Sequence, residues 1–172
     1  MEKAIFLDRD GVINEAIVKD GRPYPPKDIS ELILITGIKK LLYELKQKKY
    51  LIIVITNQPD VARKKTLKKD VEEINNYLLS NLPIDEIITC YHDNNDGCNC
   101  RKPLPGSILE AAKKYKINLN KSFMIGDRWR DIMAGRNANC KTIFIDYKYD
   151  EEVLAEPDYT INSIIEILEV IN

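Results

Sequence analysis

Short apolar runs alternate along the chain with longer stretches in which apolar residues recur every three or four positions. The short runs are typical of buried strands, and the longer stretches are typical of helices with one apolar face. The predicted strands are residues 4–7, 51–55, 86–90, 122–125 and 141–145. The predicted helices are residues 38–49, 67–79, 105–115, 129–136 and 163–170.

Strands that alternate with helices predict a parallel sheet covered on both faces. We therefore expect an α/β fold, with a doubly wound and mainly parallel sheet. The segment after the first strand, including Asp20, Gly21 and the PYPP stretch at 23–26, is predicted to be a loop. Because only small connections interrupt the pattern, residues 1–172 are expected to form one domain without a large cap domain.

Asp8 and Asp10 follow the first predicted strand in FLDRDGVIN. Residues two apart on an extended chain point the same way, so both carboxylates can face one small volume. Two carboxylates so close together repel each other, and a hard cation such as Mg²⁺ would relieve the repulsion. Asp and Gly are also common where a strand simply ends in a turn, so the pair alone is ambiguous.

Three further sets of polar side chains follow later strands: Thr56 with Asn57, Arg101 with Lys102, and Asp127 with Asp131. A hydroxyl, an amide and two cations all suit phosphate oxygens. Each set also has an ordinary explanation, as a strand-to-loop junction, a solvated surface or a helix cap. Because ligands bind beyond the carboxyl ends of parallel strands, all four sets are expected at one functional edge.

The order DRDGV, ITNQ, RKP and GDRWRD resembles the haloacid dehalogenase superfamily of phosphohydrolases, over residues 5–147. The resemblance implies an aspartyl-phosphate mechanism. Asp8 would be the nucleophile, and Asp10 would protonate the leaving oxygen and then activate water. Thr56 and Lys102 would hold the phosphoryl group.

The same resemblance implies the remaining ligands. Mg²⁺ would be held by the Asp8 carboxylate, the Asp10 backbone carbonyl and Asp127. The substrate would contact Asn57, Arg101 and Arg128. Asp131 would either orient a metal-bound water or cap the following helix.

Cys90, His92, Cys98 and Cys100 lie close together in TCYHDNNDGCNC. Three sulfurs and one imidazole suit tetrahedral Zn²⁺, and four protein ligands leave no open position, so the site would be structural. Residues 90–100 would then form a zinc-binding loop that pins Arg101 and Lys102. The alternative is a surface histidine near reduced core thiols. Cys140 lies outside this cluster and is expected to be a buried thiol.

Within the superfamily, the zinc loop resembles the group that contains heptose bisphosphate phosphatases and histidinol-phosphate phosphatases. DRDGVIN and GDRWRD resemble the heptose enzymes, whereas the five residues between His92 and Cys98 match the histidinol-phosphate type. The leading interpretation is a sugar phosphatase acting on heptose 1,7-bisphosphate. A histidinol-phosphate phosphatase, a nucleic-acid 3′-phosphatase and an inactive zinc-stabilised binding module remain alternatives.

The composition of the chain argues against nucleic acid and membranes as binding partners. Lys plus Arg (26) nearly balance Asp plus Glu (27), so no broad basic field favours nucleic acid. No apolar run approaches the ~20 residues of a membrane-spanning helix, and charges interrupt the N-terminus. We therefore expect a cytoplasmic monomer with a small sugar phosphate as substrate. Two lysine pairs, Lys64 with Lys65 and Lys68 with Lys69, are expected on a solvated helix face.

Overall fold

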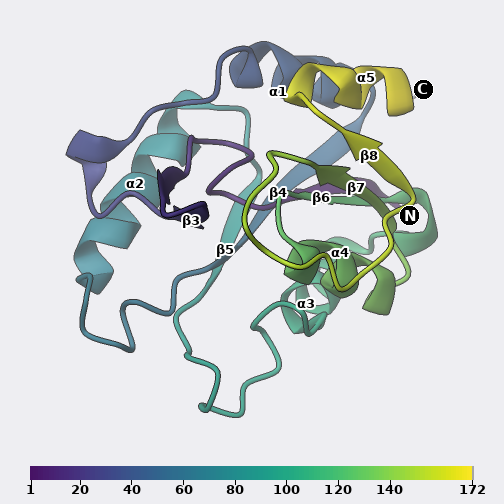
Figure 1. The fold of residues 1–172 in the computed structure, drawn as a ribbon. Helices are drawn as coiled ribbons and strands as arrows, with labels where there is room; N and C mark the ends of the chain where they lie inside the picture. Colours follow the sequence, from purple (N-terminus) through teal and green to yellow (C-terminus); the bar gives the residue numbers. More distant parts are fainter. Residues whose placement is uncertain (172) are drawn as a thin grey trace.

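The computed structural model describes residues 1–171 and contains a six-stranded parallel sheet (Figure 1). The sheet order is β5-β4-β1-β6-β7-β8. These strands are β1 (Lys3–Leu7), β4 (Tyr50–Asn57), β5 (Glu86–Cys90), β6 (Phe123–Gly126), β7 (Lys141–Ile145) and β8 (Tyr159–Ile161). Every neighbouring pair is parallel, which confirms the predicted doubly wound α/β fold.

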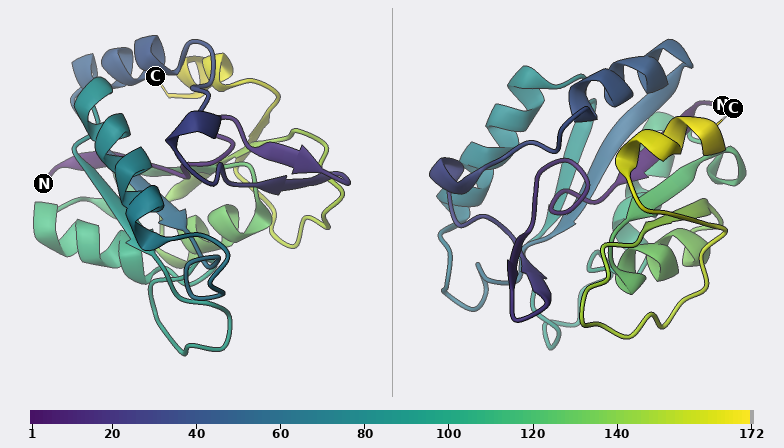
Figure 2. Two further views of the ribbon diagram at one scale, coloured as in Figure 1. Left: turned by 90° about the vertical axis from the view of Figure 1, so that its left-hand side faces the viewer. Right: turned by 45° about the horizontal axis from the view of Figure 1, so that its top comes forward.

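Helices cover both faces of the sheet (Figures 1 and 2). One face carries α1 (Ile38–Gln47), α2 (Lys68–Asn81) and α5 (Ile167–Val170), and the other carries α3 (Gly106–Tyr115) and α4 (Trp129–Asn137). Alternation along β1 fills both cores, because Ile5 and Leu7 point to the first face whereas Ala4 and Phe6 point to the second. Within residues 1–171, no helix combines the length and apolarity needed to cross a membrane.

The C-terminal helix predicted at 163–170 is only partly correct. Residues Ile164–Glu166 form a 3-10 turn, η3, and only the four residues of α5 are α-helical. Ile164, Ile167 and Ile171 are all buried. A 3-10 turn followed by one α-turn puts this spacing on one face as well as a continuous helix does, so the pattern could not separate them. The short strand β8 was not predicted, because only Ile161 of its three residues is buried.

The loop predicted after the first strand is also partly wrong, because it contains a β-hairpin. β2 (Ile17–Lys19) pairs with β3 (Arg22–Tyr24) in antiparallel register. Asp20 and Gly21 form the turn, and their φ angles are both positive, at 49° and 72°. Such Asp-Gly turns match the twist of a hairpin. The 3-10 turns η1 (Ile29–Glu31) and η2 (Leu119–Lys121) complete the connections.

The direction of winding reverses at β1. The chain passes from β1 to β4 and β5 on one side, then crosses to β6 on the other. Leu7 pairs with Val54 of β4 and with Ile125 of β6, so the carboxyl ends of these three strands meet. Such a switch point is where ligands bind in open α/β sheets.

Candidate active site

A cavity of about 350 Å³ lies at the carboxyl ends of β1, β4 and β6. It brings together eight of the predicted active-site residues: Asp8, Asp10, Asn57, Arg101, Lys102, Asp127, Arg128 and Asp131. Other lining residues come from the hairpin and the surrounding loops: Ala16, Arg22, Pro23, Tyr24, Pro25, Pro59, Asp60, Arg63, Lys65, Asn94 and Arg130. The GRPYPP stretch therefore helps to shape the cavity.

Lys102 is the charged centre of the site. Its Nζ donates to Asp8 Oδ1 and to the backbone oxygen of Ile55, and it pairs with Asp131 Oδ1, each at 2.7 Å. The side chain is buried. Burial opposes the charged form, but the carboxylates of Asp131 and Asp8 outweigh burial and raise the pKa of the ammonium. Lys102 is therefore a fixed cation that faces the predicted nucleophile.

The carboxylates around Lys102 outnumber this one cation. Carboxylate oxygens of Asp8, Asp127 and Asp131 lie within 4.8 Å of one another, and all three residues are buried. Burial raises the pKa of Asp8 to about 7; Lys102 opposes the rise, and Asp131 adds to it. Burial, followed by the charges of Asp8 and Asp131, raises the pKa of Asp127 well above its usual range.

Asp127 is poorly supplied with hydrogen-bond donors. Among the described residues, neither of its buried carboxylate oxygens has a partner at ordinary hydrogen-bond distance, and the nearby hydroxyl of Tyr149 only partly opposes the rise of its pKa. Gly11 makes room for this carboxylate, because a Cβ at that position would lie 1.9 Å from Asp127 Oδ2. Buried, unpartnered carboxylate oxygens beside other carboxylates are the donor set that a hard divalent cation prefers. The residues therefore fit Mg²⁺.

Asp10 is surrounded by donors that sequence reasoning missed. Its Oδ1 accepts from Asn14 Nδ2 at 3.0 Å and from Arg9 Nε at 3.1 Å. Its Oδ2 accepts from Gln58 Nε2 at 2.7 Å and from Arg9 Nη2 at 3.1 Å. Gln58 also donates to Thr56 Oγ1, which links the two predicted catalytic side chains. The motifs DRDG and ITNQ contain Arg9 and Gln58, but their residue types alone gave no sign of these contacts.

The side chain of Asn57 is occupied by the backbone of Lys102. Its Nδ2 donates to Lys102 O at 3.0 Å, and its Oδ1 accepts from Lys102 N at 3.1 Å. Asp131 has two partners, because it pairs with Lys102 and also accepts from the backbone N–H of Arg128, which caps α4. Asn57 therefore lines the cavity while holding Lys102 in place.

The basic side chains around the cavity differ in their pairing. Arg128 and Arg130 both contact Glu151 in the loop after β7. Arg101 donates to Asn94 Oδ1 at 3.0 Å and to a backbone oxygen. Lys65 lines the cavity, although the pattern predicted a solvated helix face. Lys64 and Lys65 are exposed but precede α2, so the predicted helix is wrong for this pair, whereas Lys68 and Lys69 are exposed in the first turn of α2, as predicted.

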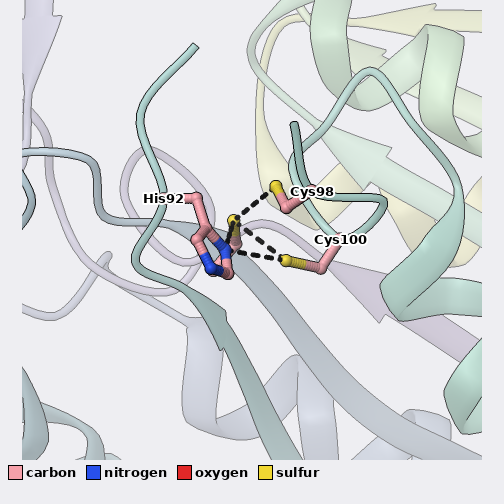
Figure 3. A group of neighbouring side chains, drawn as sticks. His92, Cys98 and Cys100 are labelled. Carbon is pink, nitrogen blue, oxygen red and sulfur yellow. Dashed lines mark hydrogen bonds between the residues drawn. The ribbon is translucent and has the colours of Figure 1, made fainter. Parts of the chain in front are cut away.

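The predicted zinc ligands converge in one cluster (Figure 3). Cys100 Sγ lies 3.2 Å from Cys90 Sγ and 3.3 Å from His92 Nδ1, and Cys98 Sγ lies 3.8 Å from Cys90 Sγ. Tetrahedral zinc with Zn–S bonds of ~2.3 Å requires sulfur separations of ~3.8 Å. The separation between Cys98 and Cys90 matches this value, whereas that between Cys100 and Cys90 is ~0.6 Å shorter, so Cys100 would shift outward to bind the ion. The donor set and its convergence therefore fit structural Zn²⁺. Cys140 is buried in the core beneath α3 and α4, as expected.

Comparisons with known proteins agree with this geometry. A family model described as haloacid dehalogenase-like hydrolase matches residues 23–145. The chain is 40% identical over 145 residues to D-glycero-beta-D-manno-heptose-1,7-bisphosphate 7-phosphatase of Helicobacter pylori, covering 81% of this chain and 80% of that protein. It is 34% identical over 148 residues to the corresponding alpha-anomer phosphatase of Campylobacter jejuni, covering 83% and 81% of the two chains.

A solved structure is similar over almost its whole length. The crystal structure of D,D-heptose 1,7-bisphosphate phosphatase from B. bronchiseptica, in complex with magnesium and phosphate, superposes with a TM-score of 0.82. The two chains are 28% identical, and the match covers 98% of this chain and 97% of that one.

Proposed function

The chain belongs to the family of haloacid dehalogenase-like hydrolases, and on that premise we propose that it is a magnesium-dependent heptose bisphosphate phosphatase. It would convert D-glycero-D-manno-heptose 1,7-bisphosphate to the 1-phosphate. The observation that carries this proposal is the buried cluster of Asp8, Lys102 and Asp127 at the switch point of the sheet. The names of the relatives support the choice of substrate.

The first step transfers the phosphoryl group to the enzyme. An oxygen of the Asp8 carboxylate attacks phosphorus, and the bond between phosphorus and the oxygen on carbon 7 breaks. Asp10 gives its proton to that leaving oxygen, which departs as an alcohol. A carboxylate nucleophile in this way divides one difficult displacement into two easier ones.

The second step releases phosphate. Asp10, now ionised, takes a proton from a water molecule whose oxygen attacks phosphorus. The bond between phosphorus and the Asp8 oxygen breaks, which restores the carboxylate. Lys102 and the hydroxyl of Thr56 hold the phosphoryl oxygens through both steps. Positive charge and donors around the transferring group stabilise the transition state.

Two metals would complete the enzyme. Mg²⁺ would be held by the Asp8 carboxylate, the Asp10 backbone carbonyl and Asp127, and when bound it would neutralise the charge of the transferring phosphoryl group. Zn²⁺ would be held by Cys90, His92, Cys98 and Cys100. Arg101 and Lys102 follow the last ligand directly, so a closed zinc site would fix where these two cations lie.

The cavity suits a substrate with two phosphates. Besides Lys102, its lining contains six basic side chains: Arg22, Arg63, Lys65, Arg101, Arg128 and Arg130. Arg22 and Lys65 have no carboxylate partner among the ion pairs of residues 1–171. Cations in the lining that have no carboxylate partner would attract a second phosphate.

We also propose that the protein is a single-domain monomer located in the cytoplasm.

Phosphate release tests the proposal. The panel contains both anomers of heptose 1,7-bisphosphate, histidinol phosphate and a 3′-phosphorylated oligonucleotide, each with Mg²⁺. We expect preference for one heptose anomer and loss of activity in Asp8→Asn, which keeps the side-chain shape but removes the nucleophile. Preference for histidinol phosphate would replace the substrate but not the mechanism. No release from any substrate by folded, zinc-loaded protein would contradict the phosphatase assignment.

A further inference from the structure

Arg9 is a completely buried charged side chain beside the cavity, and no step of the proposed mechanism uses it. Its Nε and Nη2 form a two-pronged contact with the Asp10 carboxylate, with both distances 3.1 Å. Two parallel N–H donors fix both the position and the plane of a carboxylate. A lysine in the same place would be a point charge without that fork.

The other side of the guanidinium is also held. Arg9 Nη1 donates to Asn75 Oδ1 at 3.0 Å, and Asn75 Nδ2 donates to Thr89 Oγ1 at 3.0 Å. Asn75 lies on α2, and Thr89 lies on β5 directly before the zinc-ligand candidate Cys90. A buried arginine is costly unless its donors are paired. The chain of contacts therefore ties Asp10 to two elements that are far from it in sequence.

Donors fill all four acceptor positions of the Asp10 carboxylate. Arg9 supplies two of them, Asn14 supplies one and Gln58 supplies one. A carboxylate offers about four lone-pair sites, so an oxygen that carries or accepts a proton must release one of these donors, and the remaining contacts keep the group in place. General acid and base catalysis depends on placing the proton-transferring oxygen within hydrogen-bond reach of the reacting atom.

We infer that Arg9, anchored by Asn75, is a positioning residue that fixes the Asp10 carboxylate for proton transfer; this role rests on the proposed function. Arg9 is completely buried and does not line the cavity, so it would contact neither phosphorus nor the leaving oxygen. Its loss therefore impairs the protonation of a poor leaving group more than it impairs attack by Asp8. A leaving group that needs no proton separates these two effects.

The experiment compares kcat/KM for heptose 1,7-bisphosphate with kcat/KM for p-nitrophenyl phosphate, whose leaving group departs without a proton. The value of kcat/KM reports the steps up to departure of the leaving group. For Arg9→Met we expect a loss of about 100-fold with the heptose substrate, in line with general acid catalysis, and less than about 10-fold with the aryl phosphate. Arg9→Lys should recover part of the loss, because it keeps the charge without the fork.

A second variant tests the anchor and guards against misfolding. Asn75→Ala leaves Arg9 and Asp10 intact, and we expect a smaller loss with the same preference for the aryl phosphate. Asn76→Ala is the matched control, since Asn76 is the next residue on α2 and its side chain is exposed. If thermal unfolding shows Arg9→Met to be unfolded, Arg9→Lys and Asn75→Ala decide by the same comparison. Equal losses with both substrates, or none, would overturn the positioning role. Wild-type protein inactive on both would instead overturn the proposed function, and the positioning role with it.

Discussion

Replacing Gly11 with alanine should disable the site while leaving the fold largely intact. The backbone at Gly11 has φ +93°, and a Cβ there would lie 1.9 Å from Asp127 Oδ2. An ordinary contact begins at 3.4 Å, so the carboxylate of Asp127 must retreat by about 1.5 Å. A misplacement of ~1 Å can reduce a rate by ~100-fold. We therefore expect at least about a 100-fold loss of phosphate release and weaker Mg²⁺ binding.

Gly37→Ala is a matched control for the backbone cost. Gly37 has a similar φ of +88°, but its Cβ would meet only Ile165 Cγ2 at 3.7 Å, an ordinary contact. Each substitution should cost ~1–2 kcal/mol of folding free energy from the left-handed backbone conformation. For a chain of this size, that corresponds to a fall of ~2–8 °C in Tm.

Thermal unfolding, Mg²⁺ titration calorimetry and phosphate release on the same preparations separate the two effects. Gly37→Ala should keep wild-type activity and Mg²⁺ affinity. Wild-type activity in Gly11→Ala would show that the close approach to Asp127 is unimportant. Equal inactivation of both variants would show that backbone strain, rather than displacement of the carboxylate, is responsible.

Three further substitutions test other parts of the site. Lys102→Met should abolish phosphate release and cost ~3–5 kcal/mol in urea unfolding, because it leaves buried carboxylates unpaired. Lys114→Met removes an ion pair at the surface and should leave the free energy of unfolding almost unchanged; equal costs would contradict this reasoning. Cys98→Ser should lower the zinc content measured by atomic emission and reduce activity, and Cys140→Ser should change neither; unchanged zinc in Cys98→Ser would exclude that ligand. Asn57→Ala should lower kcat by ~10-fold with little change in KM, because it releases the Lys102 backbone; a rise in KM alone would instead favour direct substrate binding.

Local sequence patterns were sufficient to predict much of the framework. Strands buried on both faces, such as residues 51–55, need continuous apolar runs, and helices that cover a sheet need one apolar face. These requirements act over a few residues and are visible in the sequence. Elements with few buried residues were not predicted, as the hairpin at 17–24 shows. Its Asp20-Gly21 pair was a usable signal, since it is a frequent hairpin turn.

The sequence by itself also determined which residues gather at the site, because parallel strands place their carboxyl ends at one edge. Asp8, Lys102 and Asp127 were predicted together for this reason, and the structure brings them together. The contacts of individual polar side chains were decided only by the tertiary structure. Arg9 is linked to Asn75, 66 residues away, and the amide of Asn57 is bound to the backbone of Lys102, 45 residues away. Hydrogen bonds depend on distances of a few tenths of an ångström between atoms that folding brings together, and no pattern of residue types along the chain specifies such distances.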